Sequence, residues 1–161
     1  MQEPNSVIDL LTYRLLRLSN TFGLYSGRRY RDAFEVSMPE WRVMSIIAMR
    51  ETTSAREISR ILATDKAWVG LSVEALRKRG LVNTMADKHD KRRTLVTLSP
   101  EGRKIHAAIL ALARDRQRRL LATLPPGAAD TLNACLDRLQ LEADRMLDEL
   151  DAAEGARPPA R

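Results

Sequence analysis

The residues best suited to chemistry in this sequence form a short cationic cluster. Lys88, Lys91, Arg92 and Arg93 lie between two segments rich in β-branched and apolar residues. A turn between two strands cannot bury these side chains, so we expect them to contact phosphate or the narrow, electronegative minor groove of duplex DNA. Asp90, two residues before Arg92 on an extended chain, is placed to hold that guanidinium in a bidentate pair. A plain surface ion pair is the alternative.

A second set of candidate contacts lies on the helix that we predict between Asp65 and Gly80. One side of this helix should face the protein core, because its residues recur at helical spacing: Val69, Ser72, Val73 and Leu76. The other side and its flanks carry the predicted DNA contacts: Lys66, Ala67, Trp68, Gly70, Leu71, Glu74 and Arg77.

The chemistry of these side chains suits both bases and phosphates. Short apolar groups such as Ala67 and Leu71 fit the thymine methyl, and a carboxylate such as Glu74 can accept from the cytosine amino group. The cations and the indole N–H of Trp68 suit phosphate oxygens. Alternatively, an exposed Leu71 marks a protein interface.

Helices with readable ends must position these groups. Ser37 and Ser54 each precede a glutamate by three residues, so the sequence predicts two capping boxes that start two helices. Thr64 or Asp65 caps the next helix, and Gly80 ends it.

A β-hairpin is predicted directly after these helices. Residues 81–85 and 94–98 are rich in β-branched and apolar residues and flank the charged stretch 87–93. A helix-turn-helix followed by a basic hairpin is typical of a winged helix, in which one helix enters the major groove and the wing reaches a neighbouring groove.

Both ends of the chain carry narrow apolar stripes at helical spacing. The N-terminal stripe is Ile8, Leu11, Leu15, Leu18, Phe22 and Tyr25, and the C-terminal stripe is Leu132, Leu136, Leu139, Ala143, Met146 and Leu150. Such helices need a covering helix, so we expect residues 6–35 and 99–150 to form the dimerisation lobe of a homodimer. A monomeric bundle is the alternative. Residues 37–98 form the predicted DNA-binding domain, and 151–161 a disordered tail.

The positive charge of the chain is concentrated in its middle. Residues 54–103 carry 11 Lys and Arg against 6 Asp and Glu, whereas the segments on either side are close to neutral. A localised positive field is typical of a nucleic-acid-binding module, and a solvated basic face is the alternative.

Other classes of protein fit the sequence poorly. No apolar run approaches the roughly 20 residues of a membrane span, and no secretory signal opens the chain, so we expect a cytoplasmic protein. His89 and His106 have no nucleophile or metal-ligand cluster near them in the sequence. We therefore expect no enzymatic activity, metal or cofactor. The single cysteine, Cys135, is expected to be a small core residue.

Four segments carry a family resemblance: residues 65–69 (DKAWV), 76–82 (LRKRGLV), 90–99 (DKRRTLVTLS) and 101–103 (EGR). With them, the chain resembles the MarR family of bacterial winged-helix regulators from Ile8 to about Leu150. The resemblance implies a mainly α fold, with a small β-hairpin wing and a helical dimerisation lobe. It also implies a sequence-specific regulator of transcription, a repressor released by a small ligand, whose Arg92 enters the minor groove.

The sequence also departs from the family pattern. Gly70 and Leu71 stand where such helices often carry a small hydroxyl residue and an arginine. We therefore expect readout to depend more on the wing and on DNA shape, with Gly70 marking close backbone approach. The departure keeps open a second function, a winged-helix interaction module without specific DNA binding.

Many members of the family are released from DNA by small aromatic acids, and peroxide-sensing members use a reactive cysteine near the N-terminus, which this chain lacks. Arg14, Arg17 and Asn20 on the first helix, with Trp41 on the second, are the residues that the resemblance suggests for such a ligand. A purely structural Trp41 in the core is the alternative.

Overall fold

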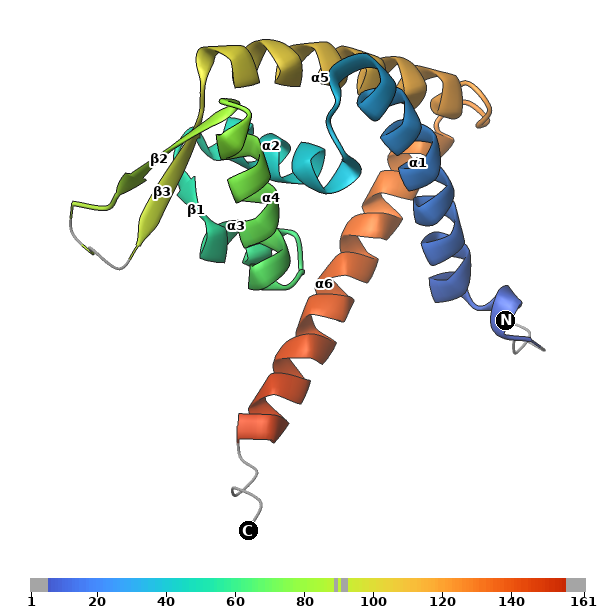
Figure 1. Cartoon of the computed structure of the whole chain (residues 1–161). Coiled ribbons are helices and arrows are strands. Elements are labelled where there is room, and N and C mark those ends of the chain that lie inside the picture. Colours follow the sequence, from blue (N-terminus) through green and yellow to red (C-terminus); the bar gives the residue numbers. More distant parts are fainter. Residues whose placement is uncertain (1–5, 89, 91–92, 156–161) are drawn as a thin grey trace. The chain divides into compact units, whose positions relative to one another are not determined.

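The computed structural model describes residues 6–88, 90 and 93–155 (Figure 1). The chain divides into two compact units, Met1–Ala113 and Arg114–Arg161. The order of elements is η1 (Val7–Asp9), α1 (Leu11–Phe34), α2 (Met38–Arg50), β1 (Thr53–Ser54), α3 (Ala55–Ile61), α4 (Lys66–Lys78), β2 (Val82–Ala86), β3 (Thr94–Leu98), α5 (Pro100–Leu121) and α6 (Ala128–Gly155).

Two of the predicted helix caps are confirmed. At the start of α2, Ser37 Oγ accepts from the backbone N–H of Glu40 at 3.4 Å, and Glu40 Oε2 accepts from the N–H of Ser37 at 2.7 Å, which completes a capping box. At the start of α4 the cap is Asp65, whose Oδ1 accepts from the N–H groups of Ala67 and Trp68 at 2.7 and 3.1 Å. An ionised carboxylate at this position also favours the positive end of the helix dipole.

The second predicted capping box is only half formed. Ser54 Oγ accepts from the N–H of Glu57 at 3.4 Å and so starts α3. The carboxylate of Glu57 does not close the box, because its Oε2 accepts from the Thr53 hydroxyl at 3.0 Å instead. Glu57 is thereby directed toward neighbouring elements rather than toward the end of its own helix.

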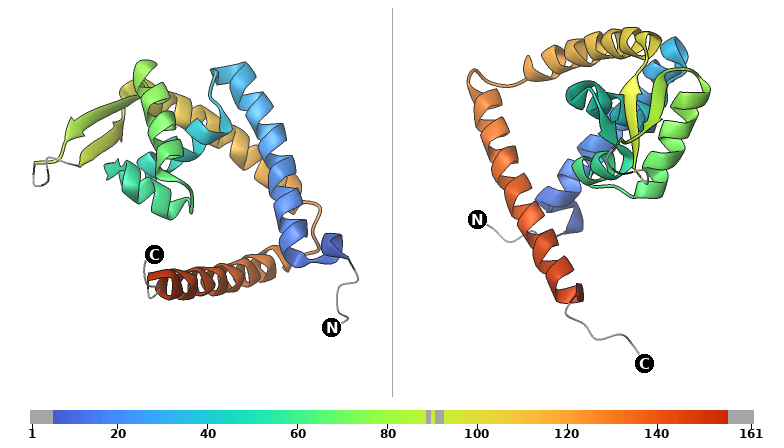
Figure 2. Two further views of the ribbon diagram at one scale, coloured as in Figure 1. Left: turned by 60° about the horizontal axis from the view of Figure 1, so that its bottom comes forward. Right: turned by 90° about the vertical axis from the view of Figure 1, so that its left-hand side faces the viewer.

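The sheet has three antiparallel strands in the order β1-β3-β2. The predicted hairpin is confirmed, with Val82 opposite Leu98 and Ala86 opposite Thr94. The sequence did not predict β1, which adds two residues to the other edge of β3, with Thr53 opposite Val96. Figures 1 and 2 show the far end of the β2–β3 hairpin projecting past the helices α3 and α4.

The core of the first unit is built from α1, α2, α3, α4, the sheet and the first half of α5. The predicted inner face of α4 is buried: Val69, Ser72, Val73 and Leu76. Gly80 follows α4 with a φ of 69°, in the left-handed region that ends helices. Gly102 in the first turn of α5 is needed for space, because a Cβ there would overlap the carbonyl oxygen of Leu81.

The two terminal helices expose large apolar side chains. On α1 these include Leu11, Leu15 and Leu18, and on α6 they include Leu132, Leu136, Leu139, Met146 and Leu150. Cys135 is exposed on α6, so its predicted place in the core is wrong for the single chain. The helix α6 also continues to Gly155, which makes residues 151–155 helical where a tail was expected. No helix among the described residues is long and apolar enough to cross a membrane.

Candidate nucleic-acid interface

The outer face of α4 is open to solvent. Lys66, Ala67, Gly70 and Leu71 are all exposed, and 74% of the Leu71 surface is accessible. A leucine so placed gains nothing from the core of its own unit. Nothing lies within 4 Å of the position that a Cβ on Gly70 would occupy, so internal packing does not require glycine in this helix.

Trp68 lies differently from the other predicted contacts of α4. Its side chain is partly buried and packs against the core cluster, so the indole mainly fixes the start of the helix against the domain. The sequence predicted Trp68 at the edge of the DNA-contact face. In the structure part of its side chain faces the protein core instead.

Glu74 and Arg77 form a pair on the exposed side of α4. Arg77 Nε and Nη2 donate to Glu74 Oε2 and Oε1, both at 2.8 Å, and Lys78 Nζ lies 4.0 Å from the same carboxylate. The hydrogen bonds from Arg77 lower the pKa of Glu74 and raise that of Arg77. Both carboxylate oxygens therefore already accept from Arg77, and each keeps a second lone pair that a cytosine amino group can use only beside the bound guanidinium.

Arg93, a predicted DNA contact, is held where the strands of the wing meet its turn, next to Thr94 of β3. Its guanidinium lies 3.6 Å from Glu57 Oε2 on α3 and 3.9 Å from Asp87 Oδ2. Glu57 Oε1 also lies 3.7 Å from Nε of Arg50 at the end of α2. These ion pairs tie the wing to α3 and α2, so Arg93 has a positioning contact that sequence reasoning missed.

The end of the hairpin is shaped by backbone hydrogen bonds. The N–H of Arg93 donates to the carbonyl of Asp90 at 2.8 Å, and the N–H of Asp87 donates to the carbonyl of Arg93 at 2.9 Å. Lys88 is exposed nearby. Lys91 and Arg92 lie outside the described residues, and so does the predicted pairing of Asp90 with Arg92.

A hollow of about 1030 Å³ lies between α3, the start of α4 and the wing. It brings together cations from three elements: Arg56 and Arg60 of α3, Lys66 of α4 and Arg93 of the wing. Asp90, Glu57 and three hydroxyl side chains complete its lining with Ala55. Sequence reasoning missed Arg56 and Arg60, although their spacing of four residues on a helix was a signal that they share one side.

The four residues suggested for a small ligand do not meet within the chain. Trp41 is buried, in edge contact with Tyr30 at 5.7 Å and stacked on His106 at 5.0 Å between ring centroids. Burial lowers the pKa of His106, which favours its neutral ring beside the indole. Arg14, Arg17 and Asn20 are exposed on α1, and Asn20 is ten residues, or about 15 Å of helix, from Tyr30.

The arrangement has a known counterpart among DNA-binding proteins. Residues 36–102 match the family model described as "Winged helix DNA-binding domain". The transcriptional regulator HosA of Escherichia coli O157:H7 is 27% identical over 108 residues, which cover 67% of this chain and 80% of that protein.

Solved structures share nearly the whole fold. A MarR/EmrR family transcriptional regulator from Acinetobacter sp. ADP1 is similar with a TM-score of 0.76 and 28% identity, over 83% of this chain and 94% of that one. The BpsR protein of Bordetella bronchiseptica, whose DNA binding is regulated by 6-hydroxynicotinic acid, gives a TM-score of 0.73 over 86% of this chain and 98% of its own. At 20% identity, the second likeness concerns the fold alone.

Proposed function

We propose that this chain, which is similar to MarR-family winged-helix, DNA-binding transcriptional regulators, is a sequence-specific repressor that binds its operator as a homodimer. One observation carries the proposal. The exposed face of α4, with Leu71 open to solvent, lies beside a hollow lined by cations of α3, α4 and the wing. Recognition of duplex DNA requires a helix face that contacts the bases and, beside it, cations that bind the phosphates.

We assign the contacts by their chemistry. Ala67 and Leu71 meet thymine methyl groups in the major groove, with Gly70 allowing the helix backbone to come close. Arg56, Arg60 and Lys66 meet phosphates beside it. At the wing, Lys88, Lys91 and Arg92 reach the backbone and the minor groove, and Asp90 orients Arg92. Bacterial duplex DNA lies in the cytoplasm, which is where this function requires the protein to act.

The homodimer rests on the terminal helices. Exposed leucines line α1 and α6 at the spacing of a helical seam, and a surface of this kind is unstable in water unless a partner covers it. A second copy of the chain supplies the same stripes, and closed two-fold pairing is the commonest form of homo-oligomer. Two copies of α4 in one dimer also match a palindromic operator.

Release by a small aromatic acid is the proposed control. The DNA binding of BpsR, which shares the fold, is regulated by 6-hydroxynicotinic acid. The exposed side of α1 offers two cations and an amide to a carboxylate, from Arg14, Arg17 and Asn20. Because Trp41 is buried away from these three residues, we propose that the rest of the ligand site is supplied by the second subunit of the dimer. A panel of benzoate-like acids that changes neither the melting temperature nor the operator affinity contradicts this control.

The rival function is an interaction module that has lost specific DNA binding, which the unusual Leu71 supports. Selection of bound duplexes from a random pool, followed by titration of the selected duplex at several salt concentrations, separates the two. A repressor yields one preferred palindromic sequence and an affinity that falls steeply with salt, by about 0.9 in log–log slope per phosphate contacted. An interaction module yields no preferred sequence.

A further inference from the structure

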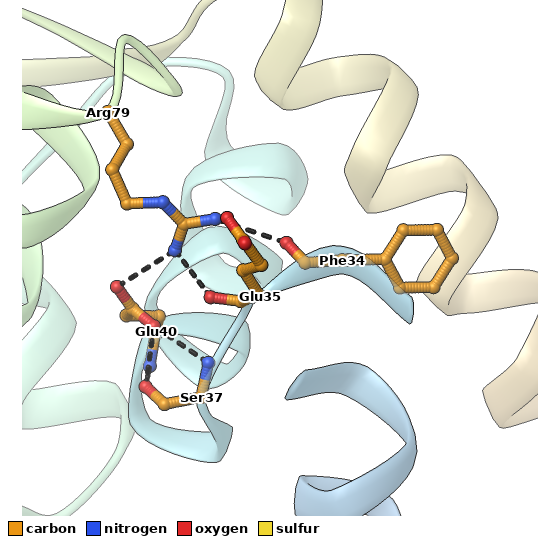
Figure 3. A network of polar contacts seen from close by, with 5 residues as sticks. All are labelled: Phe34, Glu35, Ser37, Glu40 and Arg79. Carbon is orange, nitrogen blue, oxygen red and sulfur yellow. Dashed lines mark hydrogen bonds and ion pairs between the residues drawn. The ribbon is translucent and has the colours of Figure 1, made fainter. Parts of the chain in front are cut away.

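Arg79, the residue after the last turn of α4, joins three helices (Figure 3). Its Nη1 donates to the carbonyl oxygen of Glu35 at 2.6 Å, and its Nη2 donates to that of Phe34 at 3.1 Å. Nη1 also lies 3.4 Å from Oε1 of Glu40 in the first turn of α2. One guanidinium thus connects the end of α4 with the end of α1 and the beginning of α2.

The acceptors of this contact are fixed before Arg79 reaches them. Glu35 ends α1 in the left-handed conformation, with a φ of 55°, and its N–H is bonded back to the carbonyl of Arg31. Glu40 uses Oε2 for the Ser37 cap and leaves Oε1 toward Arg79. Only 11% of the Glu40 side chain and 31% of the Arg79 side chain are exposed. The guanidinium therefore meets a preformed group of oxygens, in which the Glu40 carboxylate is mostly buried and the two carbonyls lie at the surface.

Arginine suits this place for two reasons. The last carbonyls of α1 have no partner within that helix, and the negative end of its dipole attracts a cation. A planar fork can donate in two directions to the carbonyls while facing the carboxylate, which a lysine ammonium on a flexible stem does less well. Arg77 makes a useful contrast, because its bidentate bonds stay within α4.

We propose that Arg79 is a positioning residue for operator recognition, which locks the DNA-reading helix α4 to the end of α1. The inference rests on the proposed homodimer, in which α1 belongs to the dimer contact. If α1 is fixed by the partner and α4 is fixed to α1, Arg79 sets the separation and angle of the two reading helices. It then acts on the spacing of half-sites and not on the bases.

The experiment compares two duplexes: the palindrome that the wild type selects, and the same palindrome with one base pair inserted between its half-sites. The insertion moves one half-site by about 3.4 Å and turns it by about a tenth of a turn. Arg79→Gln removes the fork, Arg79→Lys keeps only the charge, and Arg77→Gln is the matched control on the same helix. Circular dichroism and melting confirm that each full-length variant is folded.

We expect the wild type to bind the inserted palindrome on the order of 100-fold more weakly than the original. Arg79→Gln should bind the original about tenfold more weakly and reduce the penalty of the insertion to less than about tenfold, with Arg79→Lys between the two. Arg77→Gln should weaken both duplexes by the same factor. Should Arg79→Gln fail to fold, Arg79→Lys alone decides.

Folded Arg79 variants that retain the wild-type penalty overturn the inference, and so does an equal loss on both duplexes, which would make Arg79 a phosphate contact. A wild type that selects no sequence refutes the proposed function and this inference with it. If the wild type prefers the original spacing and the Arg79 variants show the same preference, the inference about Arg79 is refuted but the proposed function is not.

Discussion

The helices α4 and α6 have similar amphipathic sequences and opposite surroundings. On the inner face of α4 the apolar residues are buried in the core of the first unit, Val69 and Leu76 completely, whereas Leu71 is exposed on the outer face. On α6 the apolar residues at helical spacing, such as Leu136 and Leu139, are all substantially exposed. The apolar side of α4 is covered by other parts of its own chain, which leaves its outer face free for a partner. The apolar side of α6 needs another surface to cover it if the helix is to be stable.

The polar contacts differ in the same way. Around α4, Arg79 and the Glu57 carboxylate reach other elements over long stretches of sequence. On α6 the ion pair of Arg145 with Glu142 stays within the helix. Long-range polar contacts fix how α4 is presented, and exposed pairs within a helix contribute only a few tenths of a kcal/mol.

The largest expected effect comes from the α6 seam. Leu139→Arg places a charge in the stripe that we assign to the dimer, and burial of an unpaired charge is strongly unfavourable. We expect a monomer in sedimentation equilibrium and at least about 100-fold weaker operator binding, because one reading helix replaces two. Leu141→Arg is the matched control, since Leu141 is also an exposed leucine of α6 but lies about 200° around the helix. Equal effects of the two variants would contradict the assignment of the seam.

How far the sequence predicted these two helices follows from the range of the contacts involved. Periodicity and caps are local, so the buried face of α4, the Asp65 cap and the hairpin were all predictable. Arg79 lies 44 and 45 positions from its carbonyl acceptors, and β1 has only two residues, so neither leaves a periodic signal. Cys135 was misplaced because periodicity states which side of α6 is apolar and not which chain covers it.

The wing provides the next largest effect. Arg92→Ala should weaken binding to the selected operator by about 1–3 kcal/mol, with unchanged melting, because a minor-groove arginine contributes attraction and shape preference. Asp90→Ala should also weaken binding although it removes a negative charge near phosphate, because we propose that Asp90 orients Arg92. Both are measured by titration of labelled operator at two salt concentrations.

Lys88→Ala is the control for the wing, since Lys88 is an exposed cation of the same hairpin. It should weaken operator and unrelated duplexes alike and lower the salt slope by about one. Tighter operator binding by Asp90→Ala would show that Asp90 only repels phosphate, and the orienting role would have to be abandoned.

A smaller effect of mixed sign is expected at Gly70. Alanine in the interior of α4 stabilises the helix by up to about 1 kcal/mol, and nothing within 4 Å opposes a Cβ there. If the backbone at Gly70 approaches DNA closely, the same methyl group should weaken operator binding several-fold. Melting and titration of the single variant Gly70→Ala test both signs, and a more stable variant with unchanged affinity would remove Gly70 from the interface.

The smallest effect is expected at Glu74, where two roles compete on the exposed face of α4. In the first, the carboxylate accepts from cytosine, and Glu74→Gln relaxes the preference for one G·C pair while Arg77→Gln leaves that preference intact. In the second, which the two 2.8 Å bonds favour, Glu74 holds the Arg77 fork in place for a phosphate. Glu74→Gln should then weaken the binding of every duplex by no more than a few-fold. The double variant should bind no more weakly than Arg77→Gln alone, since the effects of substitutions within one pair are not additive.

The pH dependence gives a further check on this pair. Because Arg77 lowers the pKa of Glu74, the pair forms fully above the ordinary pKa of the carboxyl group and is lost only as pH falls through the lowered value. The effect of Glu74→Gln should therefore be constant across neutral pH. A double variant whose loss equals the sum of the two single losses, together with a relaxed preference at one base pair, would assign Glu74 to the bases and make α4 a reader of cytosine as well as of thymine methyl groups.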